Sequence, residues 1–568
     1  MHPYDRQALC NIHFFRAISA PLSETAVCYQ LPHAKKEMMI TLENIAYLLP
    51  NKDLLFSNVR LSVNKTEKMA LIGNNGAGKS TLLKIIAGEL QPSEGQLHLD
   101  VLPYYVPQLF GQYNHLTIAQ ALHVAEKIHA LHEILGGQMT EGNLNILDDD
   151  WTIEDRCIEA LNKWQLTDLD LSQPLSTLSG GQKTRVFLAG IHIHQPQLIL
   201  LDEPSNHLDT ASRRLLYDFV ESTPRTLMIV SHDRILLNLL HTVCELDSYG
   251  VTTYGGNYDF YAEQKQLAND ALHHDILSKE KALRKAKEKE RQTQERQQRL
   301  DARGKKKQEK AGVARIMMNT LRNSAEKSTA KTKGIHAEKI SGISQELQDL
   351  RKGLPGIDQM KFGFDNSATH HGKLLFSAEN IDFSYKNRLL WKEKLTFQIS
   401  SGERIALKGN NGSGKTTLIK ILLGTLEPQT GTINRAINHA VYIDQDYSLI
   451  DNDLNVYEQA QTFNTSALQE HEIKIRLNRF LFAKDKWDKP CYALSGGERM
   501  RLMLCCLTIS SQSPDVIVLD EPTNNLDIQN VEILTAAINE YQGTLIVVSH
   551  DDYFLQQIHV GRTITLAC

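Results

Sequence analysis

The chain contains the same glycine-rich string twice, and this repeat constrains the fold more than any other feature. Residues 71–88 read LIGNNGAGKSTLLKIIAG, and residues 407–424 read LKGNNGSGKTTLIKILLG. Each copy has an apolar strand pattern, a glycine loop and then a helix pattern with regular leucine and isoleucine. A G-x-x-x-x-G-K-[ST] string between a strand and a helix is a phosphate-binding loop. We therefore predict an α/β fold with two similar nucleotide-binding units.

The residue types of each loop suit a bound nucleoside triphosphate. Glycines let backbone N–H groups turn toward phosphate oxygens, where a Cβ would intrude, and the helix N-terminus adds positive charge. The lysine can reach the β- and γ-phosphates, and the hydroxyl that follows it can hold Mg²⁺. The predicted loop residues are Gly73, Asn74, Asn75, Gly76, Ala77, Gly78, Lys79, Ser80 and Thr81, and Gly409, Asn410, Asn411, Gly412, Ser413, Gly414, Lys415, Thr416 and Thr417, with Ser80 and Thr416 as Mg²⁺ ligands.

A carboxylate pair ends a fully apolar run in each half. The runs are LILLDEP, with Asp202 and Glu203, and VIVLDEP, with Asp520 and Glu521. An apolar run of this kind predicts a buried parallel strand whose carboxyl end lies beside the phosphate-binding loop. We predict that the first acid of each pair holds Mg²⁺ through water and that the second is the general base for the attacking water.

A third motif pair reads LSGGQ at residues 178–182 and LSGGE at residues 494–498. Serine and two glycines at a helix start make another anion-binding N-terminus. With the loops and acids above, each half resembles the ATP-binding cassette (ABC) ATPases. The predicted nucleotide contacts in this signature motif are Ser179, Gly180, Gly181, Gln182, Ser495, Gly496, Gly497 and Glu498.

The other ABC motifs follow in the order of that family. The Q-loop glutamines are Gln108 and Gln445. The D-loops are SNHLD (205–209) and TNNLD (523–527). The switch histidines are His232 and His550. The resemblance implies that the glutamines contact Mg²⁺ and that the histidines contact the γ-phosphate. It also implies head-to-tail pairing of the two cassettes, with two ATP molecules between them, inside one monomer. Both catalytic glutamates are present, so both sites are expected to hydrolyse ATP.

The two copies differ in two places. Tyr385 stands where ABC proteins stack an aromatic ring on adenine, whereas the first half has Leu49 there and Tyr47 two residues earlier. Base stacking in the first site is therefore in doubt unless Tyr47 replaces it. The first half also has about 20 more residues between its Q-loop and its signature, around residues 136–151. This insertion is either a small arm or a longer surface loop.

The segment between the halves is basic and rich in helix-forming residues. Residues 279–333 contain 19 Lys or Arg and 7 Asp or Glu, a net charge of +12 in a chain with a total of −5. Composition predicts two helices of about 40 residues, with a turn between Gly304 and Gly312. The segment is either a solvated linker or a surface for nucleic-acid phosphate. The predicted RNA contacts are Arg303, Lys305, Lys306, Lys307, Lys310, Arg315 and Arg322, and Ile316, Met317 and Met318 either pack the helices together or contact RNA.

Duplicated cassettes with such a linker resemble the ABC-F family over nearly the whole chain from Met38. The resemblance implies a cytoplasmic ATPase that binds the ribosome near the tRNA exit site, with its linker hairpin reaching tRNA and rRNA. We assign residues 1–37 to a leader that is disordered or not translated, and residues 38–262 to the first cassette. Residues 263–353 form the linker, residues 354–373 a connecting loop, and residues 374–568 the second cassette.

Other functions remain open at this stage. An antibiotic-resistance factor that protects the ribosome has the same motifs. A transporter subunit is the alternative from another class, and a DNA-handling ATPase is a third. The sequence has no run of the ~18 to 20 apolar residues that cross a bilayer, so no membrane span is expected. The eight cysteines follow no metal-binding spacing and are expected to be buried thiols.

Overall fold

The fold of the 568-residue chain is that of a computed structural model. The structure describes residues 37–108, 111–308, 334–335, 337–351, 372–385, 388–510, 513–524 and 526–566. The predicted leader therefore lies outside the described residues, apart from its last position, Glu37.

The first cassette contains two sheets, as the strand patterns predict. A three-stranded antiparallel sheet has the order β2-β1-β4, and a six-stranded sheet has the order β5-β6-β7-β3-β8-β9, which is parallel except for β9. Their bounds are β1 Met38–Leu48, β2 Leu54–Asn64, β3 Lys68–Ile72, β4 Glu94–Leu99, β5 Tyr104–Val106, β6 Leu198–Asp202, β7 Thr226–Val230, β8 Thr242–Asp247 and β9 Gly250–Tyr254.

The second cassette repeats this arrangement. Its antiparallel sheet has the order β13-β10-β15, a small β11-β12 ribbon contains Tyr385, and its parallel sheet has the order β16-β17-β18-β14-β19. The bounds are β10 Leu374–Asp382, β11 Ser384–Tyr385, β12 Arg388–Leu389, β13 Leu395–Ser400, β14 Arg404–Lys408, β15 Thr430–Arg435, β16 Ala440–Ile443, β17 Val516–Asp520, β18 Thr544–Val548 and β19 Arg562–Thr565.

Helices cover the parallel sheets and form a helical subdomain in each cassette. The helices of the first cassette are α1 Lys79–Ile86, α2 Ile118–Ala121, α3 Ala125–Leu135, α4 Glu141–Leu147, α5 Ile153–Lys163, α6 Gly180–His194, α7 Thr210–Ser222 and α8 Arg234–Asn238. Those of the second are α11 Lys415–Leu422, α12 Val456–Thr462, α13 Glu470–Arg479, α14 Gly496–Ile509, α15 Ile528–Glu540 and α16 Asp552–Gln557.

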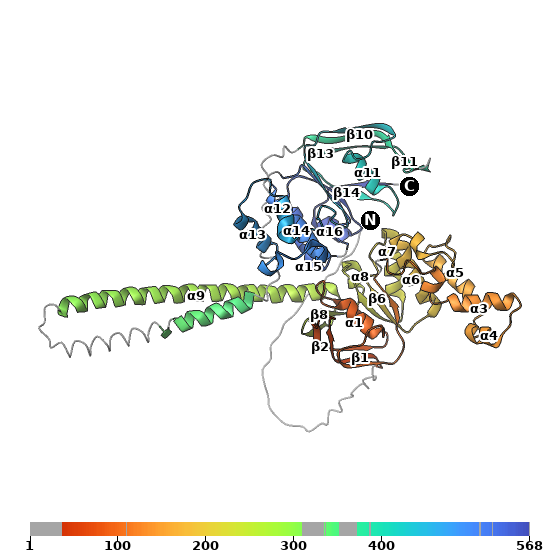
Figure 1. Cartoon of the computed structure of the whole chain (residues 1–568), viewed down its shortest axis with the longest axis horizontal. Helices are drawn as coiled ribbons and strands as arrows, with labels where there is room; N and C mark the ends of the chain where they lie inside the picture. The colour runs from red at the N-terminus through yellow and green to blue at the C-terminus, as the bar shows by residue number, and fades with distance from the viewer. Residues whose placement is uncertain are drawn as a thin grey trace, which may run out of the picture. The chain divides into compact units, whose positions relative to one another are not determined.

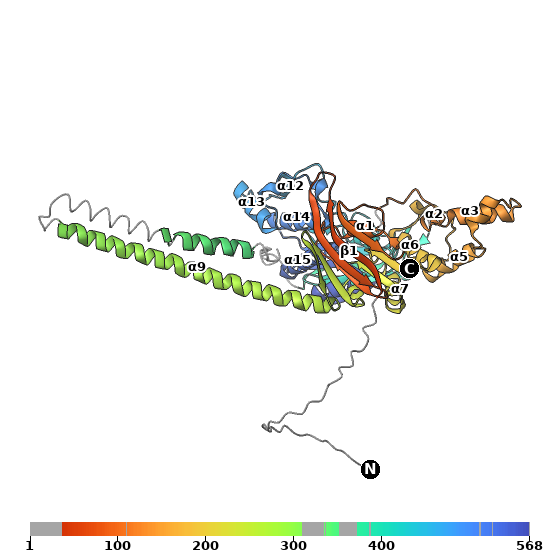
Figure 2. The same ribbon diagram turned by 90° about the horizontal axis from the view of Figure 1, so that it is seen from below.

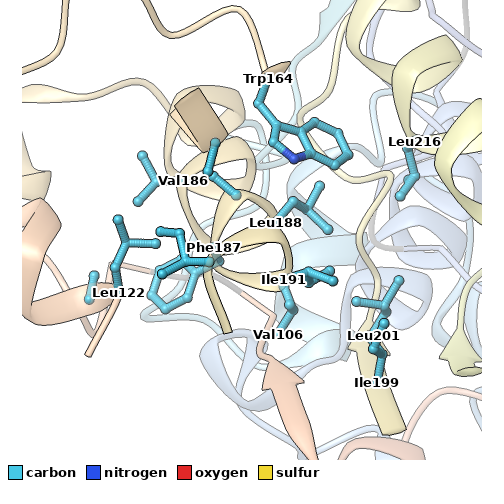
Figure 3. Packing of buried hydrophobic residues seen from close by; sticks show 14 of the residues in the cluster. Val106, Leu122, Trp164, Val186, Phe187, Leu188, Ile191, Ile199, Leu201 and Leu216 are labelled. Atoms are coloured by element: carbon cyan, nitrogen blue, oxygen red, sulfur yellow. The ribbon is translucent and has the colours of Figure 1, made fainter. Parts of the chain in front are cut away.

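The apolar runs of the sequence form the core. Every residue of β3, β6 and β7 is buried, as expected for parallel strands covered on both faces. Figure 3 shows the side of this core where α6 supplies Val186, Phe187, Leu188 and Ile191. Each fully buried side chain of this size stabilises the fold by about 1.5–3 kcal/mol. This packing fixes the ends of β3 and β6, where the functional residues follow.

The insertion in the first half is a pair of helices, α3 and α4, and not an extended loop. The two helices pack together, and Ile128, Leu131, Ile134 and Leu147 join the apolar cluster of the helical subdomain. The first three recur every third residue, which places them on one helix face. Of the two alternatives for this insertion, the structure supports the arm.

The linker begins with a single helix, α9, which spans Tyr258–Gln308 and so starts five residues before the predicted linker boundary at residue 263. Residues 337–351 are also helical and lie beside α9 in both views (Figures 1 and 2). Arg351 pairs with Glu280 at 2.5 Å, Lys279 pairs with Glu346, and both Ile276 and Leu347 are buried. The prediction of two adjoining helices therefore agrees with the described part of the linker.

The predicted turn between Gly304 and Gly312 does not begin at Gly304, because α9 continues through this residue to Gln308, and residues 309–312 lie outside the described residues. A glycine inside a helix costs about 1 kcal/mol relative to alanine, and the lysines and glutamine that follow Gly304 favour helix. Gly312, the Ile316-Met317-Met318 cluster, Lys310, Arg315 and Arg322 lie outside the described residues. The side chains of Lys305, Lys306 and Lys307 do as well, although their backbone belongs to α9.

Candidate functional site

The first phosphate-binding loop lies between β3 and α1, as the sequence predicts. Gly76 and Gly78 have φ angles of 84° and 96°, in the left-handed region that favours glycine. A Cβ on Gly78 would lie 2.7 Å from the Phe56 ring, so this position also has no room for a side chain. The Nζ atom of Lys79 donates to the carbonyl oxygens of Gly73 (2.7 Å) and Asn74 (3.2 Å). The loop is thus already wrapped around its lysine.

The second loop has the same geometry. Gly412 and Gly414 have φ angles of 83° and 85°. The Nζ atom of Lys415 donates to the carbonyl oxygen of Gly409 at 2.7 Å and lies 3.3 Å from Nε2 of His550. Because α1 and α11 each start at the lysine, both loops present a helix N-terminus to an anion.

The carboxylate pairs lie at the carboxyl ends of β6 and β17. Asp202 is 1% exposed and accepts from the Tyr105 hydroxyl at 3.2 Å, and Asp520 accepts from the Tyr442 hydroxyl at 2.9 Å. Burial raises the pKa of both aspartates. Sequence reasoning missed the two tyrosines, although each stands three residues before its Q-loop glutamine.

Each glutamate that follows is strained and paired with the switch histidine of its own cassette. Glu203 and Glu521 have φ angles of 50° and 49°, which non-glycine residues rarely adopt. Their Oε1 atoms lie 3.2 Å and 3.4 Å from Nε2 of His232 and His550. Strain at the same position in both copies is typical of a functional site. In this backbone conformation both carboxylates point toward the histidines.

Burial also changes the protonation of these groups. Desolvation raises the pKa of Glu203 to about 8 and that of Glu521 to about 7. The positive charge of the loop lysine, Lys79 or Lys415, lowers the pKa of the glutamate in its own cassette. Desolvation lowers the pKa of His550 to about 4, so its imidazole is neutral at pH 7. A neutral imidazole beside a carboxyl group of raised pKa suits proton transfer near neutral pH.

The residues present fit Mg²⁺ and a triphosphate. Oδ1 of Asp202 is buried and has no hydrogen-bond partner within the described part of the chain. Ser80 hydrogen-bonds to the same carboxylate, and Thr416 donates to Asp520 at 3.4 Å. No three His, Cys, Asp or Glu side chains form a metal cluster among the described residues. A hard cation would therefore depend on one carboxylate, one hydroxyl and phosphate oxygens, which is the usual Mg²⁺ environment.

A cavity of about 860 Å³ brings the first set of predicted residues together. Its lining includes predicted residues of the first cassette, namely Asn75, Gly76, Gly78, Lys79, Ser80, Thr81, Gln108, Asp202, Glu203 and His232. Ser495 and Gly496 of the second signature line it too, as head-to-tail pairing implies. Gln445 lies in this same cavity, although we predicted it for the second site.

Hydrogen bonds join the two cassettes at the sites. The backbone N–H of Asn75 donates to Oδ2 of Asp527 at 2.8 Å, and Nδ2 of Asn411 donates to the carbonyl oxygen of His207 at 3.1 Å. Each loop thus contacts the D-loop of the other cassette. The family resemblance implied head-to-tail pairing of the cassettes, but the sequence did not predict these contacts with the D-loops.

Two signature residues have a local structural role. The side chain of Gln182 accepts from the backbone N–H of Ser179, and Glu498 does the same for Ser495, so both complete a capping box. Burial acts against ionisation of Glu498, but Lys489, Ser495 and Lys486 together lower its pKa to about 2. These two side chains hold the helix N-termini in place, and the serines and glycines remain to face a phosphate.

The residues at the two predicted adenine positions have different surroundings. Tyr385 pairs with Arg388 across the β11-β12 ribbon, and in the first cassette the backbone N–H of Leu49 donates to the carbonyl oxygen of Asp53 at 2.9 Å. Leu49 lines the first cavity. Tyr47 packs against Phe56, with ring centroids 6.3 Å apart, and is absent from that lining. The first site therefore presents leucine where the second presents an aromatic ring.

Arg234 connects both cassettes to the linker, and sequence reasoning missed it. This residue begins α8, two positions after His232. Its guanidinium lies 3.1 Å from Glu532 and 4.4 Å from the ring centroid of Tyr553, both in the second cassette. It also lies 5.7 Å from the ring centroid of Tyr258, the first residue of α9. One side chain thus contacts α15, α16 and the start of the linker.

No described helix is both long and apolar enough to cross a membrane. The five described cysteines are all buried and unpaired, as predicted.

Comparison with known proteins agrees with the ABC motifs of both halves. The family model described as ABC transporter matches residues 56–206 and 393–524. The "Putative ATP-binding protein YdiF" of Bacillus subtilis is 32% identical, and the alignment covers 89% of this chain and 77% of that protein. The "ABC transporter F family member 5" of Arabidopsis thaliana is 31% identical, and the alignment covers 92% of this chain and 74% of that protein.

Solved structures share the fold at lower identity. An archaeal ribosome recycling factor, aABCE1, solved in complex with the ribosomal stalk protein aP1, has a TM-score of 0.57 at 20% identity. The alignment covers 92% of this chain and 87% of that one. The "RNase-L Inhibitor" gives the same values. At this identity the likeness is evidence for the fold alone.

Proposed function

Because this chain belongs to the ABC-F family of proteins with duplicated ATP-binding cassettes, we propose that it is a cytoplasmic ATPase that binds the ribosome and regulates translation. ATP binding would close the cassettes on each other, and hydrolysis would release the protein from the ribosome. The linker would contact tRNA and rRNA near the tRNA exit site. The chain would act as a monomer, since both halves of each site are in one polypeptide.

The observation that carries this proposal is the contact of Arg234 with both cassettes and with α9. The first residue of this basic helix contacts Arg234, two positions after the switch histidine His232, so the helix is placed to follow the state of the nucleotide site. The described part of α9 is already positive, because residues 279–303 contain 10 Lys or Arg and 5 Asp or Glu. Positive helices of this kind bind nucleic-acid phosphate through counterion release. A transporter subunit would have no use for such a helix.

In this proposal the loop lysines and helix N-termini bind the β- and γ-phosphates. Mg²⁺, held by Ser80 and Asp202 in one site and by Thr416 and Asp520 in the other, neutralises phosphate charge when bound. Glu203 and Glu521 accept a proton from the attacking water. His232 and His550 hold the γ-phosphate through Nε2, and the signature serines of the opposite cassette complete each site.

A pelleting assay tests this proposal. Purified protein is mixed with bacterial ribosomes and either ATP or ADP, spun through a sucrose cushion, and assayed in parallel for phosphate release. We expect more protein in the pellet with ATP than with ADP, and phosphate release that ribosomes stimulate. Recovery in the supernatant under both conditions would rule out ribosome binding, and recovery only with added membranes would favour the transporter alternative.

Exchange of the adenine-position residues should change nucleotide affinity in opposite directions. Aromatic stacking on a base contributes about 1–3 kcal/mol. Tyr385→Leu should therefore weaken ATP binding to the second site about fivefold or more, whereas Leu49→Tyr should strengthen binding to the first. Equilibrium titration with a fluorescent ATP analogue measures both. Inorganic tripolyphosphate, which has no base, is the control ligand, and an equal loss of its binding would contradict a stacking role.

A further inference from the structure

The two switch histidines have different partners in the opposite cassette. Nδ1 of His550 lies 3.2 Å from the hydroxyl of Thr210, the first residue of α7. Arg213, one turn further along, lies 3.5 Å from the carbonyl oxygen of His550. Arg213 is itself held by the Leu208 carbonyl oxygen at 3.2 Å and by Asp233 at 3.7 Å. The second site therefore receives two polar side chains from the first cassette.

The first site does not receive their equivalents. Alignment of SNHLDT (205–210) with TNNLDI (523–528) matches Thr210 with Ile528, and Arg213 then matches Val531. Ile528 packs against the apolar core of the first cassette. In agreement with this, Nδ1 of His232 is buried and has no hydrogen-bond partner in the described part of the chain. The unpartnered nitrogen and the isoleucine are independent observations of the same difference.

From this difference we infer that Thr210 makes the second site hydrolyse ATP faster than the first. The hydroxyl beside Nδ1 fixes the orientation of the imidazole ring and so directs Nε2 toward Lys415 and Glu521, where the γ-phosphate would lie. Thr210 would be a positioning residue, acting in trans through His550. The inference rests on the ATPase activity proposed above.

The chemical step is the same in both sites. The water oxygen forms a bond to the γ-phosphorus, the bond from that phosphorus to the leaving ADP oxygen breaks, and the water proton passes to Glu203 or Glu521. While the glutamate interacts with water, it no longer holds the histidine ring. In the second site Thr210 still holds the ring, whereas in the first site no described side chain takes this place. The difference between the sites should therefore appear in turnover rather than in ATP binding.

Single-site chains measure each rate separately. Glu203→Gln leaves only the second site active, and Glu521→Gln leaves only the first. We expect the chain with an active second site to have a kcat about fivefold higher or more. Adding Thr210→Val to it should lower kcat to the level of the first site with KM unchanged, and Thr210→Ser should retain the rate. Adding Ile528→Thr to the other chain should raise its kcat.

The outcomes separate this inference from the proposed function. Equal kcat values in the two single-site chains would overturn the inference while leaving the ATPase intact. Equal damage from Thr210→Val and Thr210→Ser would assign Thr210 a packing role and would also overturn it. Absence of ATP turnover in the unmodified chain would overturn the proposed function itself. Near-identical melting temperatures of the Val and Ser variants exclude misfolding as the cause of a lower rate.

Discussion

Replacement of both Glu203 and Glu521 by glutamine is expected to reduce ATP turnover by about 10² to 10⁴-fold, the usual contribution of a general base. Glu203 is buried and Glu521 is partly buried, and both lie at the same strained position, 3.2–3.4 Å from a switch histidine. Glutamine has nearly the same shape and can still accept a hydrogen bond, but it cannot take a proton from water. ATP binding should therefore survive.

This variant should also remain on the ribosome. If hydrolysis releases the protein, a chain that binds ATP without hydrolysing it should sediment with ribosomes in a larger fraction than the unmodified chain. Sucrose-gradient fractionation of a lysate measures this fraction. The matched control is Glu43→Gln with Glu379→Gln, because these exposed glutamates occupy equivalent positions in β1 and β10. Accumulation of the catalytic variant only in the free pool would contradict the proposed cycle.

Reversal of charge at the far end of α9 is expected to have the second largest effect. Lys305, Lys306 and Lys307 lie in its last two turns. Each lysine that contacts a phosphate adds about 0.7–0.9 to the slope of log affinity against log salt. Changing all three to glutamate should lower ribosome affinity about tenfold or more and reduce the slope by about 2 to 3. Binding measured between 50 and 200 mM salt tests both values.

The control for this experiment reverses two charges elsewhere. Lys392 and Lys394 are exposed residues of the second cassette that lie outside the sites and the linker. Their change to glutamate should leave affinity and salt slope nearly unchanged. If the α9 variant also behaves like the unmodified chain, its lysines belong to a solvated linker and make no phosphate contact.

Much of the fold and of both sites was predictable from the sequence, because each motif follows a local rule. Gly78 and Gly414 must adopt positive φ in a tight loop, and the run that ends in Asp202 can only be a buried strand. These constraints act within a few residues of the chain. The duplication made them easier to recognise, because the same spacing occurs twice.

The features that the sequence did not predict depend on contacts between distant segments. Asp527 and Asn75 are far apart in the chain, and no local pattern shows that they meet. Gly304 was expected to end a helix, but one glycine cannot outweigh the helix-forming residues on both sides. The turn residues at 136–151 left an arm and a loop as equal alternatives, and the sequence analysis did not predict α3, which ends at Leu135.

The length of α9 has a mechanical consequence. Its 51 residues span about 76 Å at 1.5 Å per residue. Arg234 contacts α9 at Tyr258, and Glu245 of β8 pairs with Lys265 at 2.9 Å, so α9 is a lever whose fulcrum lies in its first turns. A rotation of about 5° at that fulcrum would displace the far end by roughly 7 Å, more than the pitch of an α-helix. An ångström-scale rearrangement around a γ-phosphate would thus be magnified into a movement as large as a nucleotide step.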